Sequence, residues 1–300
     1  MDEVLLAIDA GQTGIKLRLE RPGAEPVERV LPGVRTDQPL LPQLADAART
    51  VAGEVPIDVV AAGASGLTSL EHDASALRDL LPWDSRVLLA HDSVTSYLGT
   101  LGELPGVVVA SGTGSIVFAV GPAGVARVDG WGYLMGDAGS GFWLGRQALD
   151  AVMRAHDGRG PATSLTAVVR EHWPDLEDAY VLLQSDPARV SVVASFARAV
   201  AEHADTDPVA ARICREAGEE LALSAVTALR RVGVETSPFV SAIGGVLRGA
   251  HVRAAFEEAV LAVHPTARFE APHGTGIDGA VALARLAPEH PLRKLVATAG

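Results

Sequence analysis

Apolar and polar positions follow the same plan in two parts of the chain. In the first, an apolar run over residues 4–10 leads into a turn rich in glycine and threonine, and residues 15–19 then alternate apolar and polar side chains. Residues 106–120 repeat that plan around a turn, residues 111–115, of small and hydroxyl residues only. An apolar run, a turn and an alternating run predict a β-hairpin. Two such hairpins predict a duplicated fold.

The composition of both turns suits the binding of anions. Glycine lets the backbone approach a ligand closely because it has no Cβ, and successive turn N–H groups form a concavity that attracts phosphate. One such hairpin in each half of a duplicated fold is what gripping the phosphates of a nucleotide from both sides requires. Taken alone, each turn is more often an ordinary hairpin, and neither contains the G-x-x-x-x-G-K-[ST] motif of a P-loop.

The remaining pattern alternates strands with helices, which predicts a largely parallel or mixed sheet covered on both faces. We expect strands at residues 58–62, 86–90, 239–243 and 268–269, and helices at residues 75–81, 93–101, 142–155, 208–232, 247–263 and 278–286. Residues 163–232 are mostly helical, and the tail after residue 288 is expected to fray. The fold class is therefore α/β.

Length and charge narrow the function classes. With 300 residues the chain is long enough for two domains with a buried core. A formal net charge of -12 argues against nucleic acid or an anionic membrane surface as the main partner, because no basic patch could dominate the field. Asp9 interrupts the first apolar run, so the N-terminus resembles neither a secretory signal nor a membrane span. We expect a cytoplasmic protein.

Two residue counts exclude further chemistry. The chain has one cysteine, Cys214, which excludes a disulfide framework and any zinc site or iron–sulfur cluster ligated by several cysteines of one chain. It has no asparagine, so it carries no N-glycosylation sequon.

Four short motifs follow one another along nearly the whole chain. They are Asp9-x-Gly11-x-Thr13, the 111–115 turn, the run 130–132 with its continuation 136–145, and residues 241–246. In this order they resemble the two phosphate motifs, the acceptor loop and the adenosine motif of the actin-like ATPase superfamily of sugar kinases. The acceptor loop is most similar to that of N-acetylglucosamine kinases, within the BadF/BadG-type ATPase family.

The resemblance implies a two-domain actin-like ATPase fold, a duplicated ribonuclease H-like fold with a nucleotide cleft between its domains. We expect a small N-terminal domain at residues 1–108, completed by a C-terminal helix at about 278–300, and a large domain at residues 109–277. The resemblance also implies ATP and Mg²⁺ as cofactors, a small-molecule sugar as substrate, and assembly as a homodimer.

The resemblance assigns roles on the nucleotide side. Asp9 would hold Mg²⁺ through water, because Mg²⁺ keeps several of its waters, although an aspartate there could simply form the turn. Lys16 would reach a phosphate as a mobile charge, or lie on an exposed strand face. The other nucleotide-binding residues would be Gly11, Gln12 and Thr13, then Gly112, Thr113 and Gly114, and finally Gly244 and Gly245 of the adenosine motif.

Asp92 is the candidate general base. It follows the strand expected at residues 86–90, at the carboxyl end where open α/β sheets place their ligands, and the family's catalytic carboxylate falls at the same position. A base of this kind contributes about 10²–10⁴-fold to the rate. The alternative is that Asp92 is the N-cap of the helix expected at residues 93–101.

On the acceptor side, Asp137 would accept hydrogen bonds from sugar hydroxyls, with help from the backbone at Gly132. Trp131 would offer a flat face to the sugar ring, or would pack in the core. Thr113 would contact both phosphate and acceptor. Two positions depart from the motif, because Ala138 stands where an acidic residue is usual and the asparagine that contacts the N-acetyl group is missing. Gln38 is the closest chemical substitute for it.

These residues predict an ATP-dependent kinase that phosphorylates the 6-hydroxyl of an amino sugar, with N-acetylglucosamine as the first choice. Glucosamine, N-acetylmuramic acid and a plain hexose are alternative acceptors for the same fold. An ATPase activator that supplies electrons would need more cysteines than Cys214. A nucleotide or sugar sensor that has lost transfer activity would not need Asp92.

Overall fold

The computed structural model describes residues 3–11, 13–35, 37–68 and 72–300, and the chain divides into two compact units. Unit 1 comprises Met1–Leu104 and Ala271–Gly300, and unit 2 comprises Pro105–Glu270. A boundary after residue 108 would cut through strand β6 (Gly106–Ser111), and one after residue 277 would cut through helix α10 (Gly276–Arg285). The boundaries therefore lie a few residues earlier than the sequence suggested, between elements.

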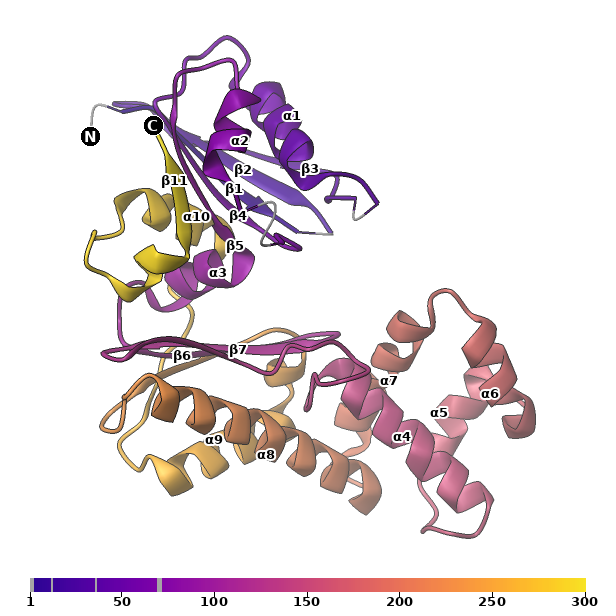
Figure 1. The fold of residues 1–300 in the computed structure, drawn as a ribbon. Helices are drawn as coiled ribbons and strands as arrows, with labels where there is room; N and C mark the ends of the chain where they lie inside the picture. Colours follow the sequence, from indigo (N-terminus) through magenta and orange to yellow (C-terminus); the bar gives the residue numbers. More distant parts are fainter. Residues whose placement is uncertain (1–2, 12, 36, 69–71) are drawn as a thin grey trace. The chain divides into compact units, whose positions relative to one another are not determined.

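Unit 1 is built on a mixed sheet with the strand order β11-β5-β4-β1-β2-β3 (Figure 1). Strands β1 to β3 form an antiparallel meander, β4 and β5 run parallel to β1, and β11 closes the far edge antiparallel to β5. The strands are β1 (Leu5–Ala10), β2 (Ile15–Glu20), β3 (Val27–Leu31), β4 (Val59–Ala64), β5 (Arg86–His91) and β11 (Val296–Ala299). The hairpin expected at residues 4–19 is β1 with β2.

Helices cover both faces of this sheet. Helices α1 (Leu40–Ala52) and α2 (Ala74–Asp79) pack on one face, and α3 (Asp92–Leu101) and α10 pack together on the other (Figure 1). The tail expected to fray instead forms a 3₁₀ turn, η2 (Pro291–Leu295), and β11. The expectation of fraying was wrong because the 296–299 backbone pairs with residues 87–90 of β5.

Unit 2 repeats the sheet plan of unit 1. Its strand order is β10-β9-β6-β7-β8, with β6 to β8 as an antiparallel meander and β9 and β10 parallel to β6. The remaining strands are β7 (Ser115–Gly121), β8 (Gly124–Val128), β9 (Phe239–Ile243) and β10 (Arg268–Phe269). The predicted duplication is therefore visible in the topology. In each unit the first strand of the antiparallel meander, β1 or β6, pairs along its other edge with a parallel strand, β4 or β9.

Helix α8 (Pro208–Arg231) lies along the sheet of unit 2 and packs against α9 (Ala250–Val263). Helices α4 (Gly141–His156) and α7 (Arg189–His203) pack on each other, with α5 (Leu165–His172) and α6 (Leu176–Ser185) beside them (Figure 1). The helix expected at residues 247–263 is divided into a 3₁₀ turn, η1 (Val246–Arg248), and α9, because the chain is extended at Gly249.

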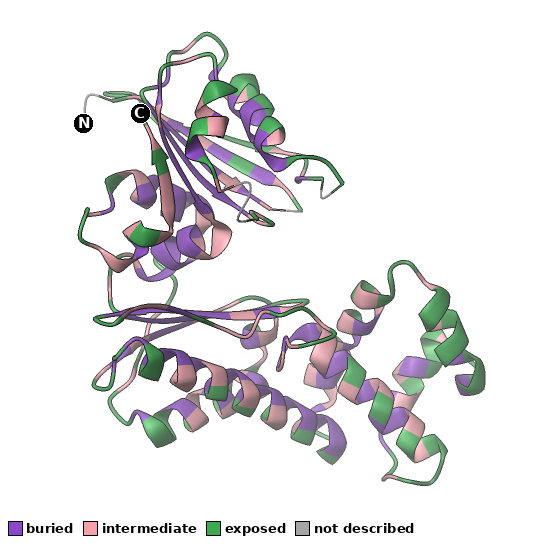
Figure 2. Cartoon of the chain, in the orientation of Figure 1, coloured by how far each residue is buried: buried purple, intermediate pink, exposed green. Residues whose placement is uncertain are grey.

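Each unit has its own hydrophobic core. Every residue of β1 is buried or half-buried, whereas β2 alternates buried with more exposed side chains, as the apolar run and the alternating run in the sequence predict. Figure 2 shows the buried residues along the strands and on the helix faces that meet the sheets. Among the described residues no helix is long and apolar enough to cross a membrane.

A buried carboxylate ties the start of α8 to the start of α5. Asp207, 5% exposed, is the N-cap of α8 and accepts a hydrogen bond from Val209 N–H at 2.8 Å. It also accepts hydrogen bonds from Thr163 Oγ1 at 2.5 Å and from Ser164 N–H and Oγ, both at 2.8 Å. Burial alone would raise the pKa of Asp207, but these hydrogen bonds outweigh it and lower the pKa to about 2.

Replacing Asp207→Asn should lower the free energy of unfolding by about 2.5 kcal/mol at pH 7, because the pKa is lowered from 3.8 to about 2 and each unit corresponds to about 1.4 kcal/mol. Because the folded-state pKa is depressed, this stabilisation is present above about pH 4 and is lost as the pH falls through about 2. Urea unfolding from pH 7 to pH 2 measures the difference. Asp175→Asn, at the exposed N-cap of α6, is the control and should change little. A pH-independent difference would contradict the prediction.

Candidate functional site

In unit 1, Asp9 and Lys16 face each other across the first hairpin. They are paired in the register of β1 and β2, and Asp92 lies close enough for its charge to act on Asp9. Burial raises the pKa of Asp9, the charge of Lys16 opposes that rise, and the charge of Asp92 adds to it. The structure thus brings together the predicted metal-binding carboxylate, the predicted base and the lysine. Lys16 is exposed to solvent. It therefore lies on an exposed face of β2 and, at the same time, opposite Asp9 of β1.

Asp92 is the first residue of α3 and not its N-cap. The cap is His91, whose Nδ1 accepts a hydrogen bond from Ser93 N–H at 3.2 Å. The N-cap alternative for Asp92 was therefore wrong, because the chain enters the helix one residue earlier than expected. The Asp92 side chain is about one-third exposed, with Oδ1 2.8 Å from Nδ1 of His91. Its carboxylate is open to a ligand at the carboxyl end of β5.

The turn between β1 and β2 is closed by its own backbone. Gly11 N–H donates to Gly14 O at 3.0 Å, and Val34 N–H donates to Gly11 O at 3.0 Å. Thr13 is exposed at the tip of the turn. Gln12, expected to bind phosphate here, lies outside the described residues.

The residues around Asp9 suit a hydrated cation better than a fully ligated one. Within the described ranges no group of three or more histidine, cysteine, aspartate or glutamate side chains could enclose a metal. Mg²⁺ keeps several waters and takes one or two carboxylates, so Asp9 beside Asp92 fits that ion. The space around the Asp9 carboxylate is limited on one side by Gly276, at the start of α10. A Cβ on Gly276 would lie 2.5 Å from Oδ2 of Asp9.

In unit 2, the turn between β6 and β7 is fixed by the start of α4. Gly112 N–H donates to Gly114 O at 2.9 Å within the turn. Gly141 N–H then donates to Gly112 O at 2.7 Å, and Phe142 N–H donates to Thr113 O at 3.0 Å. The carbonyls of Gly112 and Thr113 therefore accept hydrogen bonds from the first amides of α4. This is the rigid glycine turn that the phosphate role requires.

A cavity of about 500 Å³ opens beside this turn. Its lining includes Gly112 and Thr113 of the turn, Gly245 of the adenosine motif and Gly249 three residues beyond that motif, together with residues of α7. Gly244 is required by its surroundings, because its φ is +98° and a Cβ would overlap Ser111 O. The structure thus brings three of the predicted residues of this unit, Gly112, Thr113 and Gly245, to one cavity.

Cys214 also lines this cavity and is fully buried. Burial raises the pKa of its thiol to about 11, so it stays protonated at neutral pH.

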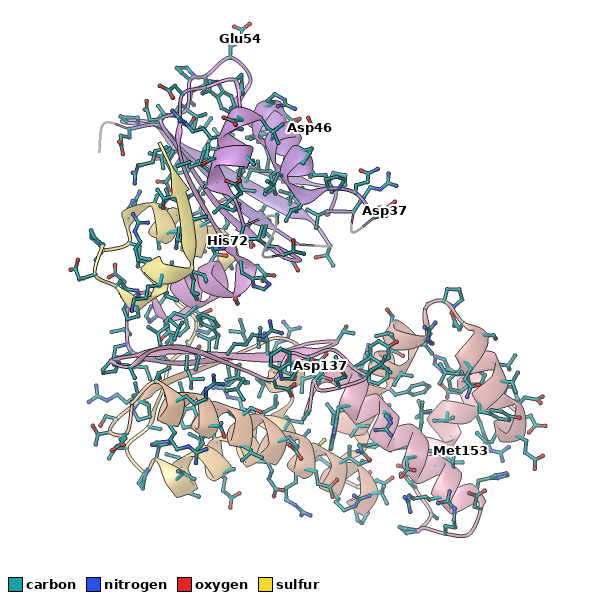
Figure 3. The ribbon with its side chains drawn as sticks, viewed as in Figure 1. Asp37, Asp46, Glu54, His72, Asp137 and Met153 are labelled. Carbon is teal, nitrogen blue, oxygen red and sulfur yellow. The ribbon has the colours of Figure 1, made fainter. Side chains whose placement is uncertain are left out.

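Asp137 belongs to the acceptor loop, whose backbone folds on itself over residues 129–138, and its side chain faces Gly114 of the 111–115 turn. It is 8% exposed; its Oδ1 accepts a hydrogen bond from Gly132 N–H at 3.1 Å, and its Oδ2 is 2.6 Å from where a Cβ on Gly114 would be. Figure 3 labels Asp137 just before the first turn of α4. Burial raises the pKa of Asp137, the hydrogen bond from Gly132 opposes the rise, and the charge of Asp129 adds to it.

Trp131 is exposed to 58%, so the alternative that it packs in the core was wrong. The tight loop turns at Gly130 and Gly132, both with positive φ, and carries the indole outward. The guanidinium of Arg127 lies 4.7 Å from the centre of its ring. Leu134 and Met135 in the same loop are exposed as well.

Sequence reasoning missed Asp129. Its carboxylate accepts hydrogen bonds from three backbone amides of the acceptor loop, those of Gly130, Asp137 and Ala138, at 2.8–2.9 Å. The signal available in the sequence was the Asp129-Gly130 pair, which is typical of a turn with positive φ. That signal identifies a turn and does not show which amides the side chain will reach.

Gln38, the predicted substitute for the missing asparagine, belongs to unit 1 and is exposed between β3 and α1. Its N–H donates to Arg35 O at 3.2 Å, and its carbonyl accepts from Gln43 Nε2 at 3.3 Å. The acyl-binding role of Gln38 stays a prediction.

Comparisons with known proteins identify relatives of this chain. The model of the BadF/BadG/BcrA/BcrD ATPase family matches residues 8–284. An N-acetylmuramic acid/N-acetylglucosamine kinase from Clostridium acetobutylicum is 29% identical over 193 residues, which are 62% of this chain and 63% of that protein. An N-acetyl-D-glucosamine kinase from Dictyostelium discoideum is 38% identical over 124 residues, 39% of each chain. The matches span less than two thirds of the length of either relative.

One solved structure extends the comparison to nearly the whole chain. It is a candidate N-acetylglucosamine kinase from Chromobacterium violaceum, with a TM-score of 0.70 and 27% identity over 94% of this chain and 98% of its own. Together with the family match, it confirms the expected α/β actin-like ATPase fold.

Gly114 and Gly112 form a matched pair for testing the packing of the turn against Asp137. A Cβ on Gly114 would lie 2.6 Å from Oδ2 of Asp137, whereas a Cβ on Gly112 would have nothing within 4 Å. Gly114→Ala should therefore lower the free energy of unfolding by about 1–3 kcal/mol, as overpacking does. Gly112→Ala should change it by less than about 1 kcal/mol. Thermal and urea unfolding measure both, and equal effects would show that Asp137 does not press on Gly114.

Proposed function

The chain belongs to the BadF/BadG/BcrA/BcrD ATPase family, and we propose that it is an ATP-dependent kinase that phosphorylates the 6-hydroxyl of an amino sugar. We take N-acetylglucosamine as its first acceptor. Two relatives bear the names of kinases for this sugar, and one of them is also named for N-acetylmuramic acid. Because they match over only part of their length, the substrate is argued here from the residues of this chain.

The observation that carries the proposal is the position of Asp137. A buried carboxylate between a glycine turn and a loop of backbone amides can accept hydrogen bonds from two sugar hydroxyls, and its neighbour Gly114 belongs to the turn assigned to phosphate. A hydroxyl bound there would lie next to the phosphate-binding backbone. Transfer of a phosphoryl group depends mainly on such positioning and on charge stabilisation.

We assign the binding of ATP to the two glycine turns and the cavity. Backbone amides around Gly11 and Gly112 would bind phosphate oxygens, with Thr13, Thr113 and Gly114, and Lys16 would add a positive charge. Adenosine would occupy the cavity beside Gly244 and Gly245. ATP supplies the phosphoryl group, and Mg²⁺ would neutralise part of its charge. Asp9 would hold the ion through water.

Asp92 would accept the proton of the 6-hydroxyl as that oxygen attacks. A general base must lie within hydrogen-bond reach of the hydroxyl it deprotonates. Asp92 has a partly exposed carboxylate at the carboxyl end of β5, and its Oδ1 lies 2.8 Å from Nδ1 of His91. Trp131, with its exposed ring, would lie against the apolar face of the sugar.

Asp92→Asn should reduce kcat by about 10²-fold or more, because it keeps the shape of the side chain and removes the proton acceptor. The KM for ATP should change little, since the phosphate turns are formed by other residues. Steady-state kinetics with saturating sugar measure both constants. Asp73→Asn, at the exposed N-cap of α2, is the control and should keep normal turnover. Near-normal turnover in Asp92→Asn would show that Asp92 is not the base.

The acceptor is identified by comparing kcat/KM for N-acetylglucosamine, glucosamine, N-acetylmuramic acid and glucose in an ADP-release assay. Glucose, glucosamine and N-acetylglucosamine carry the same 3- and 4-hydroxyls, so Asp137 and Gly132 should not separate these three strongly. Without a hydrogen bond to the acyl group, we expect N-acetylglucosamine to be preferred by only about 10–200-fold. A preference above about 10⁴ would show that this chain replaces the missing asparagine contact, with Gln38 as the first residue to test. No turnover of any amino sugar would overturn the proposed substrate.

A further inference from the structure

The carboxylate of Asp129 joins the two ends of the acceptor loop. Its Oδ1 accepts hydrogen bonds from Gly130 N–H and from Asp137 N–H, both at 2.8 Å. Its Oδ2 accepts a hydrogen bond from Ala138 N–H at 2.9 Å. One side chain therefore binds the residue that opens the loop and the two residues that close it.

The loop is shaped around this carboxylate. Asp129 has a φ of 60° and Asp137 a φ of 59°, a region that residues other than glycine seldom adopt. A Cβ on Gly136 would overlap Oδ1 of Asp129, so only glycine fits there. The side chain of Asp129 thus holds the backbone at both aspartates in a conformation that local preference disfavours.

We propose that Asp129 is a positioning residue for the sugar acceptor. This inference deepens the proposed function and rests on it. By binding the amide of Asp137, Asp129 fixes that residue's backbone, and the Asp137 carboxylate is then held on its other side by Gly132 N–H. Asp129 acts through Asp137 and need not touch the sugar itself.

Two substitutions of Asp129 distinguish a displaced Asp137 carboxylate from a general loss of stability. Asp129→Ala removes all three acceptors, so the loop loses its closure and Asp137 loses its fixed direction. Asp129→Asn keeps one carbonyl oxygen for Gly130 and Asp137, but its amide NH₂ would face the N–H of Ala138. The asparagine variant should therefore fall between the wild type and the alanine variant.

We expect Asp129→Ala to raise the KM for N-acetylglucosamine by up to about 10²-fold, the size of effect that a displacement of about 1 Å produces, with the KM for ATP nearly unchanged. Asp129→Asn should recover part of the loss. In the double variant Asp129→Ala with Asp137→Asn, the two effects should not multiply, because both act through the same carboxylate. Steady-state kinetics give the constants, and calorimetric titration with N-acetylglucosamine measures binding without transfer.

Asp207→Ala is the matched control. It also removes hydrogen bonds from several donors in unit 2, so it should lower stability, but its KM for the sugar should stay that of the wild type. Unchanged sugar KM in both Asp129 variants would overturn the inference, and so would an equal rise in the KM for sugar and for ATP. A wild-type protein that neither binds nor phosphorylates any sugar would instead overturn the proposed function. Binding that is normal in the wild type and unaltered by Asp129→Ala would overturn this inference alone.

Discussion

The contact between the 112–114 turn and the 137–142 segment is the constraint on which the candidate site of unit 2 depends. The amides of Gly141 and Phe142 donate hydrogen bonds to carbonyls of the turn. In the other direction, Ser111 Oγ donates to Gly139 O and Ser115 Oγ donates to Ala138 O, each at 3.1 Å. These bonds run both ways between two segments far apart in the sequence. They make the phosphate turn, the acceptor loop and the start of α4 one rigid piece, and rigid placement of donors is what phosphoryl transfer requires.

Unit 1 applies a different constraint to a similar sheet. Its glycine turn is closed by its own backbone, and the distinctive feature is charge, with Asp9 facing Lys16 across the strand pair and Asp92 acting on Asp9. Two carboxylates that approach each other in a partly buried place repel, and a cation relieves that repulsion. The two units therefore share a sheet topology but differ in the chemical groups beside their glycine turns. Unit 1 presents two carboxylates and a lysine, and unit 2 presents a glycine turn beside the buried carboxylate of Asp137.

The sequence was sufficient wherever a local pattern settles the outcome. The hairpin at residues 4–19 and strand β9 follow from alternation and turn residues, and the capped start of α8 follows from Pro208. It was insufficient where distant pairing decides, as for β11, whose four residues form a strand only because β5 offers a free edge. The same holds within the site. Asp92 was predicted as a candidate base from its position after a strand and from the family resemblance, but Asp129 was missed because its partners, Asp137 and Ala138, follow eight and nine residues later.

Asp129 also bears on how a departure from a motif should be understood. Ala138 lacks the acidic side chain usual at its position, yet the amide of that residue is bound by a carboxylate, that of Asp129. A loop whose ends meet can place an acid at one point in space from either end of its sequence. Comparing motifs position by position would record only a loss here, whereas the structure shows an acidic residue, Asp129, bound to the backbone amide of Ala138. The same reasoning applies to the missing asparagine, because a contact to an acyl group depends on where a donor lies in space and not on which residue supplies it.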